Sequence, residues 1–187
     1  MVKRSLLVLF VIGVAAQVLV APAAQAASRQ YRPDAWIKLC GQSTGCTINP
    51  PPHPWLGNNI YNSTGYHQKI FQKIDNGEGV RYWINFQNDG TQKDTYLLHG
   101  CKGTKNFLIN AVLVGKYKVP QGVGVDHITK QFIHNTYKFT LKPGKHLAIT
   151  LNIVTVNANK HYTCPVTITS QGDSTKSDTV AAVMKTF

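Results

Sequence analysis

The sequence is poor in acidic residues and lacks the common catalytic motifs. It has 20 lysines and arginines but only 8 aspartates and glutamates, and Glu78 is the only glutamate. It contains no G-x-S-x-G, no H-E-x-x-H and no phosphate-binding loop. A glycosidase would need two carboxylates opposed across a cleft, a requirement that sequence spacing leaves open. Most of the acids fall in predicted turns or at strand starts, where carboxylates make local hydrogen bonds, so we expect no enzymatic activity.

Metal-binding motifs are missing as well. None of the seven histidines lies two or four residues from another, so no single strand face or helical turn would present two imidazoles. The turns 75–79 and 88–90 carry oxygen ligands, but neither matches an EF-hand loop. We therefore expect no metal and no cofactor, and a site assembled from distant histidines is the alternative.

A long apolar run occurs only near the start of the chain. Lys3 and Arg4 precede the apolar residues 6–20, and 24-AQA-26 follows, which together are the three parts of a secretory signal peptide. The run of 15 residues is shorter than the roughly 20 that span a bilayer. We predict cleavage after Ala26, which leaves residues 27–187 as a single secreted domain with no membrane span.

The predicted mature chain is strongly basic. The net charge of the full sequence is +12, and loss of Lys3 and Arg4 leaves +10. Such a charge favours polyanions, for example an envelope polymer, anionic lipid head groups or nucleic acid. The alternative is a solvated lysine surface that protects strand edges. Because no cluster of arginines and aromatic residues is evident, we expect no specific nucleic-acid partner.

Apolar and polar residues alternate along most of the chain. In 80-VRYWINFQ-87, the side chains of Val80, Tyr82, Ile84 and Phe86 share one face. No segment has helical periodicity. The pattern predicts an all-β, immunoglobulin-like antiparallel β-sandwich of about seven to nine strands, preceded by a loop-rich lead-in over about 27–66. Besides 80–87, the candidate segments for these strands are 35–39, 68–74, 94–101, 106–114, 130–135, 137–142, 147–154, 162–168 and 178–186.

Turn-forming residues separate these strands. The segment 88-NDG-90 predicts a hairpin between the strand that ends near Gln87 and the one that begins near Asp94. Pro143 and Gly144 predict a type II turn between two strands, and 171-QGDS-174 separates the last two.

All four cysteines follow the predicted cleavage site. An even number in an exported chain favours two disulfides over free thiols or a metal site, and three pairings are possible. We predict Cys40 with Cys46, because 40-CGQSTGC-46 suits a small closed loop, and Cys101 with Cys164, which joins distant segments.

The neighbours of Cys164 support a position in a strand. Cys164 shares its face with Tyr162, Val166 and Ile168, so its sulfur is expected to point inward. Pro165 donates no ladder hydrogen bond, which predicts a local edge or a bulge in this strand.

Several segments together resemble a known family. They are 32-RPDAWIKL-39, 57-GNNIYNSTG-65, 84-INFQNDGTQKDTYLLHG-100, 138-KFTLKPGKHLAITLNIVTV-156 and 178-DTVAAVMKT-186. As a set they resemble the CARDB-like immunoglobulin-like domains of secreted bacterial proteins, a group named for a link to cell adhesion. This resemblance covers nearly all of the predicted mature chain. It implies a non-enzymatic β-sandwich that is usually one module of a longer surface protein, although the four cysteines depart from the pattern.

The stretch 54-PWLGNNIYNSTGYHQ-68 mixes turn formers with apolar residues. The resemblance implies that its asparagines and glycines fix turns, while Trp55, Ile60 and Tyr61 close the end of the core. The alternative is functional: Trp55 and Tyr61, beside the stiff 50-PPPHP-54 run, would form a stacking surface for a sugar or a peptide.

These observations predict a secreted, disulfide-stabilised structural or binding module of the bacterial cell surface or extracellular space, with an adhesion-related role implied by the resemblance. Its partner would be an anionic envelope polymer or another surface protein. The alternatives are a soluble basic binder of polyanions, a small enzyme inhibitor, and a filament subunit that joins its neighbours through an exposed strand.

Overall fold

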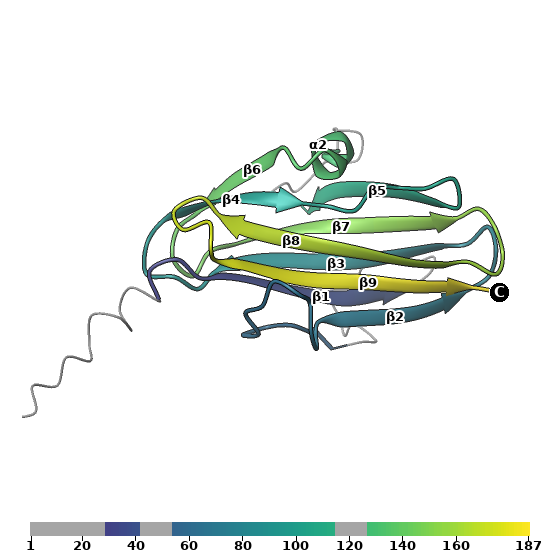
Figure 1. The fold of residues 1–187 in the computed structure, drawn as a ribbon, viewed down its shortest axis with the longest axis horizontal. Helices are drawn as coiled ribbons and strands as arrows, with labels where there is room; N and C mark the ends of the chain where they lie inside the picture. The colour runs from purple at the N-terminus through teal and green to yellow at the C-terminus, as the bar shows by residue number, and fades with distance from the viewer. Residues whose placement is uncertain (1–28, 42–53, 115–126) are drawn as a thin grey trace, which may run out of the picture.

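The described part of the chain forms two packed β-sheets. The computed structural model describes residues 29–41, 54–114 and 127–187 (Figure 1). The four-stranded sheet has the order β1-β3-β7-β5, and the five-stranded sheet has the order β2-β9-β8-β4-β6. The predicted all-β sandwich is therefore confirmed. The strands are β1 (Pro33–Gly41), β2 (Lys69–Ile74), β3 (Gly79–Asn88), β4 (Asp94–His99), β5 (Phe107–Val114), β6 (Tyr137–Leu141), β7 (His146–Thr155), β8 (His161–Ser170) and β9 (Ser177–Thr186).

The core lies between the two sheets, as the alternation predicts. The predicted inner residues of β3 are all buried, and so are Val166 and Ile168 of β8 in the other sheet. Burial of apolar area of this kind is the main favourable term in folding. The alternate side chains of β3 point away from the core, onto the outer face of the four-stranded sheet.

The segment 130–135 is not a strand, so this prediction was wrong. Thr129–Ile133 form the short helix α2, in which Phe132 N donates to Ile128 O (2.7 Å). One helical turn places Ile128 and Phe132 on the same side, where both are buried. A single turn is too short to leave a helical period in the sequence.

Among the described residues, no helix is long and apolar enough to cross a bilayer.

The predicted hairpin at 88-NDG-90 was also wrong, because β3 and β4 belong to different sheets. Both edges of β3 are already paired, one with β1 and the other with β7, so no edge is free for β4. Asn88 instead fixes a crossover between the sheets. Its amide nitrogen donates to Gln92 O (2.8 Å) and Leu141 O (3.0 Å), and its amide oxygen accepts from Gly90 N (2.9 Å).

Two other predicted turns are confirmed. At Pro143-Gly144, Lys145 N donates to Lys142 O (3.0 Å) and Gly144 has a φ of 68°, which suits a glycine at the third position of a type II turn. The 171–174 turn joins β8 to β9, which pair antiparallel.

The sandwich departs from a fully antiparallel order at one edge. β2 pairs with β9 in parallel, and the two arrows in Figure 1 point the same way. Parallel neighbours need a long connection, and here nearly the whole domain lies between the two strands. In this sheet β9 is an inner strand, with β2 on one side and β8 on the other.

One disulfide links the two distant segments that the sequence indicates. Cys101 and Cys164 are bonded, with 5.0 Å between their Cα atoms, which confirms this pairing. Cys40 is also disulfide-bonded, but Cys46 lies outside the described residues, so its pairing with Cys40 stays a prediction.

The surroundings of Pro165 match the predicted local edge. β8 pairs with β4 only over Thr167 to Ser170, whereas Pro165 lies opposite Ala181 of β9. Next to Pro165, β8 therefore has a strand partner on one side.

Replacing both Cys101 and Cys164 with alanine should destabilise the fold. The bond closes a loop with a sequence separation of 63, and loss of that constraint corresponds to about 4 kcal/mol on the chain-entropy model. We expect the free energy of unfolding, measured by urea denaturation under oxidising conditions, to fall by about 2–4 kcal/mol. A loss below about 1 kcal/mol would contradict this assignment.

Candidate functional site

Three buried polar side chains hold the lead-in loop against both sheets. Asp178 of β9 accepts from Ala35 N of β1 (2.7 Å) and from Asn62 N of the loop (2.9 Å). Asp34 of β1 accepts from Asn59 N (3.0 Å). Gln68 donates to Asp178 (3.2 Å) and to loop carbonyls. We call Asp34, Gln68 and Asp178 the buried polar triad.

The loop itself follows the turn chemistry of its glycines and asparagines. Gly57, Asn59 and Gly65 all have positive φ angles of 107°, 61° and 68°. A Cβ atom on Gly57 would lie 2.8 Å from the carbonyl oxygen of Ala35, so a side chain does not fit there. The expected turn-fixing role of these residues is confirmed.

A second segment, residues 29–32, is fixed beside this loop. Three backbone hydrogen bonds of 2.9 to 3.3 Å tie it to residues 89–92. The ring of Tyr31 packs on Gly172 of the β8–β9 turn, where an added Cβ would lie 2.3 Å from a ring carbon. These contacts position Arg29 and Arg32, both of which line a groove.

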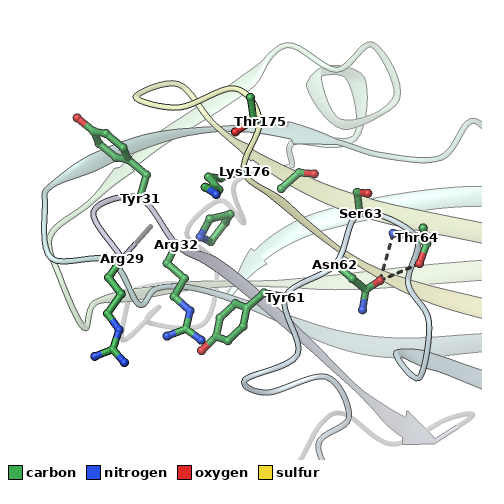
Figure 2. A pocket seen from close by; sticks show the side chains of 11 residues that line it. Arg29, Tyr31, Arg32, Tyr61, Asn62, Ser63, Thr64, Thr175 and Lys176 are labelled. Atoms are coloured by element: carbon green, nitrogen blue, oxygen red, sulfur yellow. Dashed lines mark hydrogen bonds between the residues drawn. The ribbon is translucent and has the colours of Figure 1, made fainter. Parts of the chain in front are cut away.

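The groove, of about 550 Å³, lies between the start of β1, the loop 61–64 and the β8–β9 turn. Three cationic side chains line it: Arg29, Arg32 and Lys176. Hydroxyl groups come from both walls, and no acidic residue is among the described residues that line it. Figure 2 shows Arg29 and Arg32 directed to the same side. We call this the basic groove.

Tyr61 forms part of the groove wall. The Arg32 guanidinium carbon lies 3.7 Å from the centre of the Tyr61 ring, a cation–π contact that is visible in Figure 2. The Tyr61 hydroxyl donates to Asp89 (2.7 Å). Burial and this bond to Asp89 raise the pKa of Tyr61 well above its usual range, so the phenol stays neutral.

Trp55 lies elsewhere, so the expectation that it closes the end of the core was wrong. Backbone bonds between Ile37 and Leu56, of 2.8 and 2.9 Å, attach the loop to the outer edge of β1. Leu56 packs against the core, and Trp55 joins the outer face of the four-stranded sheet. There its ring centroid is 5.2 Å from that of Trp36 and 6.2 Å from that of Trp83.

Strand register brings a lysine into this group. Lys38 lies opposite Trp83 in the β1–β3 pair, and its ammonium nitrogen is 4.7 Å from the ring centroids of both Trp55 and Trp83. Lys38 is only 5% exposed. Burial lowers the pKa of its ammonium group, and the electron-rich indole faces offset part of the lost hydration.

The three tryptophans border a shallow cavity of about 260 Å³. Its other walls carry polar groups from Asn85, Gln87 and His146. With its oxygen toward Trp36, the Asn85 amide accepts from the indole nitrogen and donates to Leu147 O (3.2 Å). We call this the tryptophan cavity.

One carboxylate connects the two surfaces. Asp89 accepts from Gln87 of the tryptophan cavity (2.7 Å) and from Tyr61 of the basic groove (2.7 Å). The structure thus places Trp55 and Tyr61, the two predicted stacking residues, on different but linked surfaces.

Most of the site residues were missed at the level of sequence. Strand alternation does place Trp83 on the polar face of β3 beside Arg81, a position where a large aromatic side chain stands out. The arginines of 29–32 and Lys176 are too far apart in sequence to suggest a common groove.

The described residues offer no ready metal site. In this part of the chain, no three His, Cys, Asp or Glu side chains gather closely enough to hold a metal ion. The two carboxylates that lie together, Asp34 and Asp178, are fully buried and serve the loop.

The comparisons with known proteins give only distant likenesses. No family model and no curated protein matches the chain. Among solved structures, the N-terminal domain of PorA aligns over 81% of this chain and 96% of its own, with 13% identity and a TM-score of 0.41. The ASH / PapD-like domain of human CEP192 aligns over 64% and 81%, with 13% identity and a TM-score of 0.35.

A family 123 glycoside hydrolase from Clostridium perfringens also aligns, over 64% of this chain, with 12% identity and a TM-score of 0.42. This chain spans 23% of the length of that enzyme. Likeness at this level carries no function to the present chain.

The buried polar triad should make stability depend on pH. Asp34 is fully buried, and one of its oxygens has no hydrogen-bond partner among the described residues. Burial raises its pKa to about 7, and the Asp89 and Asp178 carboxylates act in the same direction. Because the folded state binds this proton more tightly than the unfolded chain, its contribution is full below about pH 4 and is lost as pH rises through 7.

We therefore expect the free energy of unfolding to fall by an amount on the order of 2 kcal/mol between pH 5 and pH 8, after allowance for solvent screening. The substitution Asp34→Asn should flatten this fall, whereas Asp75→Asn, in an exposed turn, should leave it unchanged. Urea denaturation at both pH values measures the effect. Equal slopes for the wild type and Asp34→Asn would contradict the assignment.

Proposed function

We propose that this protein is a secreted, non-enzymatic binding module that holds an anionic polymer of the cell envelope in its basic groove. The observation that carries this proposal is the convergence of Arg29, Arg32 and Lys176 on one groove whose described lining residues include no acid. Three cations at one concave surface create a positive potential that attracts a chain of carboxylates or phosphates.

The polar lining of the groove suits such a ligand. Guanidinium groups bind carboxylate and phosphate oxygens in a bidentate manner. The Ser63 hydroxyl adds a neutral donor on the loop wall, whereas the hydroxyls of Thr64 and Thr175 already donate to Asn62 (3.0 Å) and Asp173 (2.6 Å) and can only accept from a ligand. The predicted mature charge of +10 would draw the polymer to the protein, and the groove would fix its position.

The proposal places the protein outside the cytoplasm. Its support is the signal-peptide pattern ending at Ala26, together with the Cys101–Cys164 disulfide, which is typical of oxidising compartments. The resemblance to CARDB-like immunoglobulin-like domains favours an adhesion-related role at a bacterial surface. Binding of an envelope polymer would give the domain a way to stay at that surface.

The absence of catalysis is also part of the proposal. General acid–base chemistry needs titratable groups within reach of the ligand. Asp34 and Asp178 have raised pKa values of about 7 and about 6, but both lie beneath the loop and neither lines the groove. Their oxygens accept hydrogen bonds from backbone N–H groups instead.

The groove is tested by neutralising its cations. Arg29→Gln, Arg32→Gln and Lys176→Gln together should weaken binding of polygalacturonate and of polyphosphate at least about tenfold, since each lost charge contact is worth roughly 0.5 kcal/mol. Isothermal titration calorimetry at low and moderate salt measures the affinity. Methyl-esterified polygalacturonate, which lacks the charge, should bind much more weakly.

A variant of equal net charge separates the groove from the overall charge. Lys105→Gln, Lys138→Gln and Lys160→Gln remove three exposed charges away from the groove and should change the affinity little. Equal losses in both triple variants would assign the binding to net charge and reject the groove.

A further inference from the structure

We infer that the tryptophan cavity is a sugar-binding subsite, so that the ligand is an acidic polysaccharide with one pyranose ring on the indoles and its acidic groups in the basic groove. This inference rests on the proposed function for the acidic part of the ligand. The evidence that the ligand contains a sugar ring comes from the tryptophan cavity alone.

The lining of the cavity matches the chemistry of a pyranose. A sugar ring has an apolar C–H face and an equatorial belt of hydroxyls. Trp36, Trp55 and Trp83 supply flat apolar faces, and the Gln87 amide, which uses one N–H on Asp89, supplies a donor and an acceptor at their side. His146, opposite Gln87 in the β3–β7 pair, adds an imidazole that can donate or accept.

The size of the cavity selects one small ring. At about 260 Å³ it lies just below the range of roughly 300–1,000 Å³ that is usual for drug-sized ligands. Ala148 sits opposite Asn85 on the same face, and its small side chain leaves the hollow between the larger neighbours.

The rings are held in place before any ligand arrives. The Ile37–Leu56 bridge positions Trp55, and the β1–β3 register positions Trp36 and Trp83. The ammonium nitrogen of Lys38 contacts both Trp55 and Trp83, at 4.7 Å from each ring centroid. A rigid aromatic surface loses little conformational entropy on binding.

The link to the basic groove identifies the polymer. Asp89 bonds to Gln87 on one surface and to Tyr61 on the other, and Tyr61 is covered by Arg32. A ligand that spans the two surfaces must present a ring at one end and an anionic group at the other. Uronic-acid polysaccharides combine both features.

Tryptophan fluorescence reports on this cavity directly. The chain has three tryptophans, and all three lie in the cluster. We expect the emission of the purified protein to change on titration with at least one of polygalacturonate, alginate and hyaluronate. Polyphosphate, which has no sugar ring, should bind without that change. No response to any of the three polysaccharides would overturn the inference.

Variants separate this subsite from the groove. Trp83→Ala, and Ala148→Leu, which fills the hollow and keeps every indole, should each weaken binding of the responsive polysaccharide about tenfold and leave polyphosphate binding unchanged. Leu108→Ala, an exposed change on the same sheet outside the cavity, is the matched control. Wild-type affinity of Ala148→Leu for the polysaccharide would overturn the inference.

The same measurements separate failure of the proposed groove function from failure of the sugar subsite. If the groove variant Arg29→Gln, Arg32→Gln and Lys176→Gln keeps its affinity for polyphosphate while the cavity variants lose the polysaccharide, the groove is rejected and the sugar subsite stands. A fluorescence change on dilution of the protein without any sugar would assign the indoles to a contact between two copies of the chain, and would overturn the inference.

Discussion

The hydrogen bonds of the buried polar triad join the two sheets to the loop that carries Trp55 and Tyr61, and both candidate surfaces depend on this connection. Asp178 comes from the last strand, in the five-stranded sheet, and accepts from the backbone of β1 in the four-stranded sheet. It also accepts from the loop that carries Tyr61. A buried polar group is costly unless it is hydrogen-bonded, and Asp34 and Asp178 meet part of this cost by accepting from the backbone N–H groups of Asn59, Ala35 and Asn62. Together with the Ile37–Leu56 backbone bonds, they fix the position of the loop.

Both candidate surfaces are built on that fixed loop. Trp55 and Tyr61 lie near its start, only six positions apart in sequence, and they face different surfaces because a turn with positive φ angles at Gly57 and Asn59 separates them. The flanking elements are rigid strands and a segment bonded to residues 89–92. Binding groups held in this way need little reorganisation, which is the condition for affinity from few contacts.

Much of the fold could be predicted from the sequence, because strand periodicity is a local signal. Apolar and polar residues alternate from Val80 to Phe86, as in a strand with one buried face. The predicted inward direction of the Cys164 side chain agrees with its bond to Cys101. The predictions fail where pairing with strands distant in sequence determines the structure. The Asn88 turn is locally plausible as a hairpin, but both edges of β3 are occupied by distant strands. The tryptophan cavity depends on the register that sets Lys38 opposite Trp83, and no local pattern encodes that offset.

The position of β9 governs when this chain can fold. It follows the other described strands in sequence, yet it lies inside its sheet between β2 and β8, and its Asp178 anchors a loop more than a hundred residues earlier. The five-stranded sheet and the loop therefore cannot be completed until β9 (Ser177–Thr186) has been synthesised. Contacts of such long sequence separation form slowly, because the chain must close large loops before they contribute. Such late completion of the sheet is compatible with the secretion that we propose, since a chain that lacks β9 stays open and can cross a membrane unfolded.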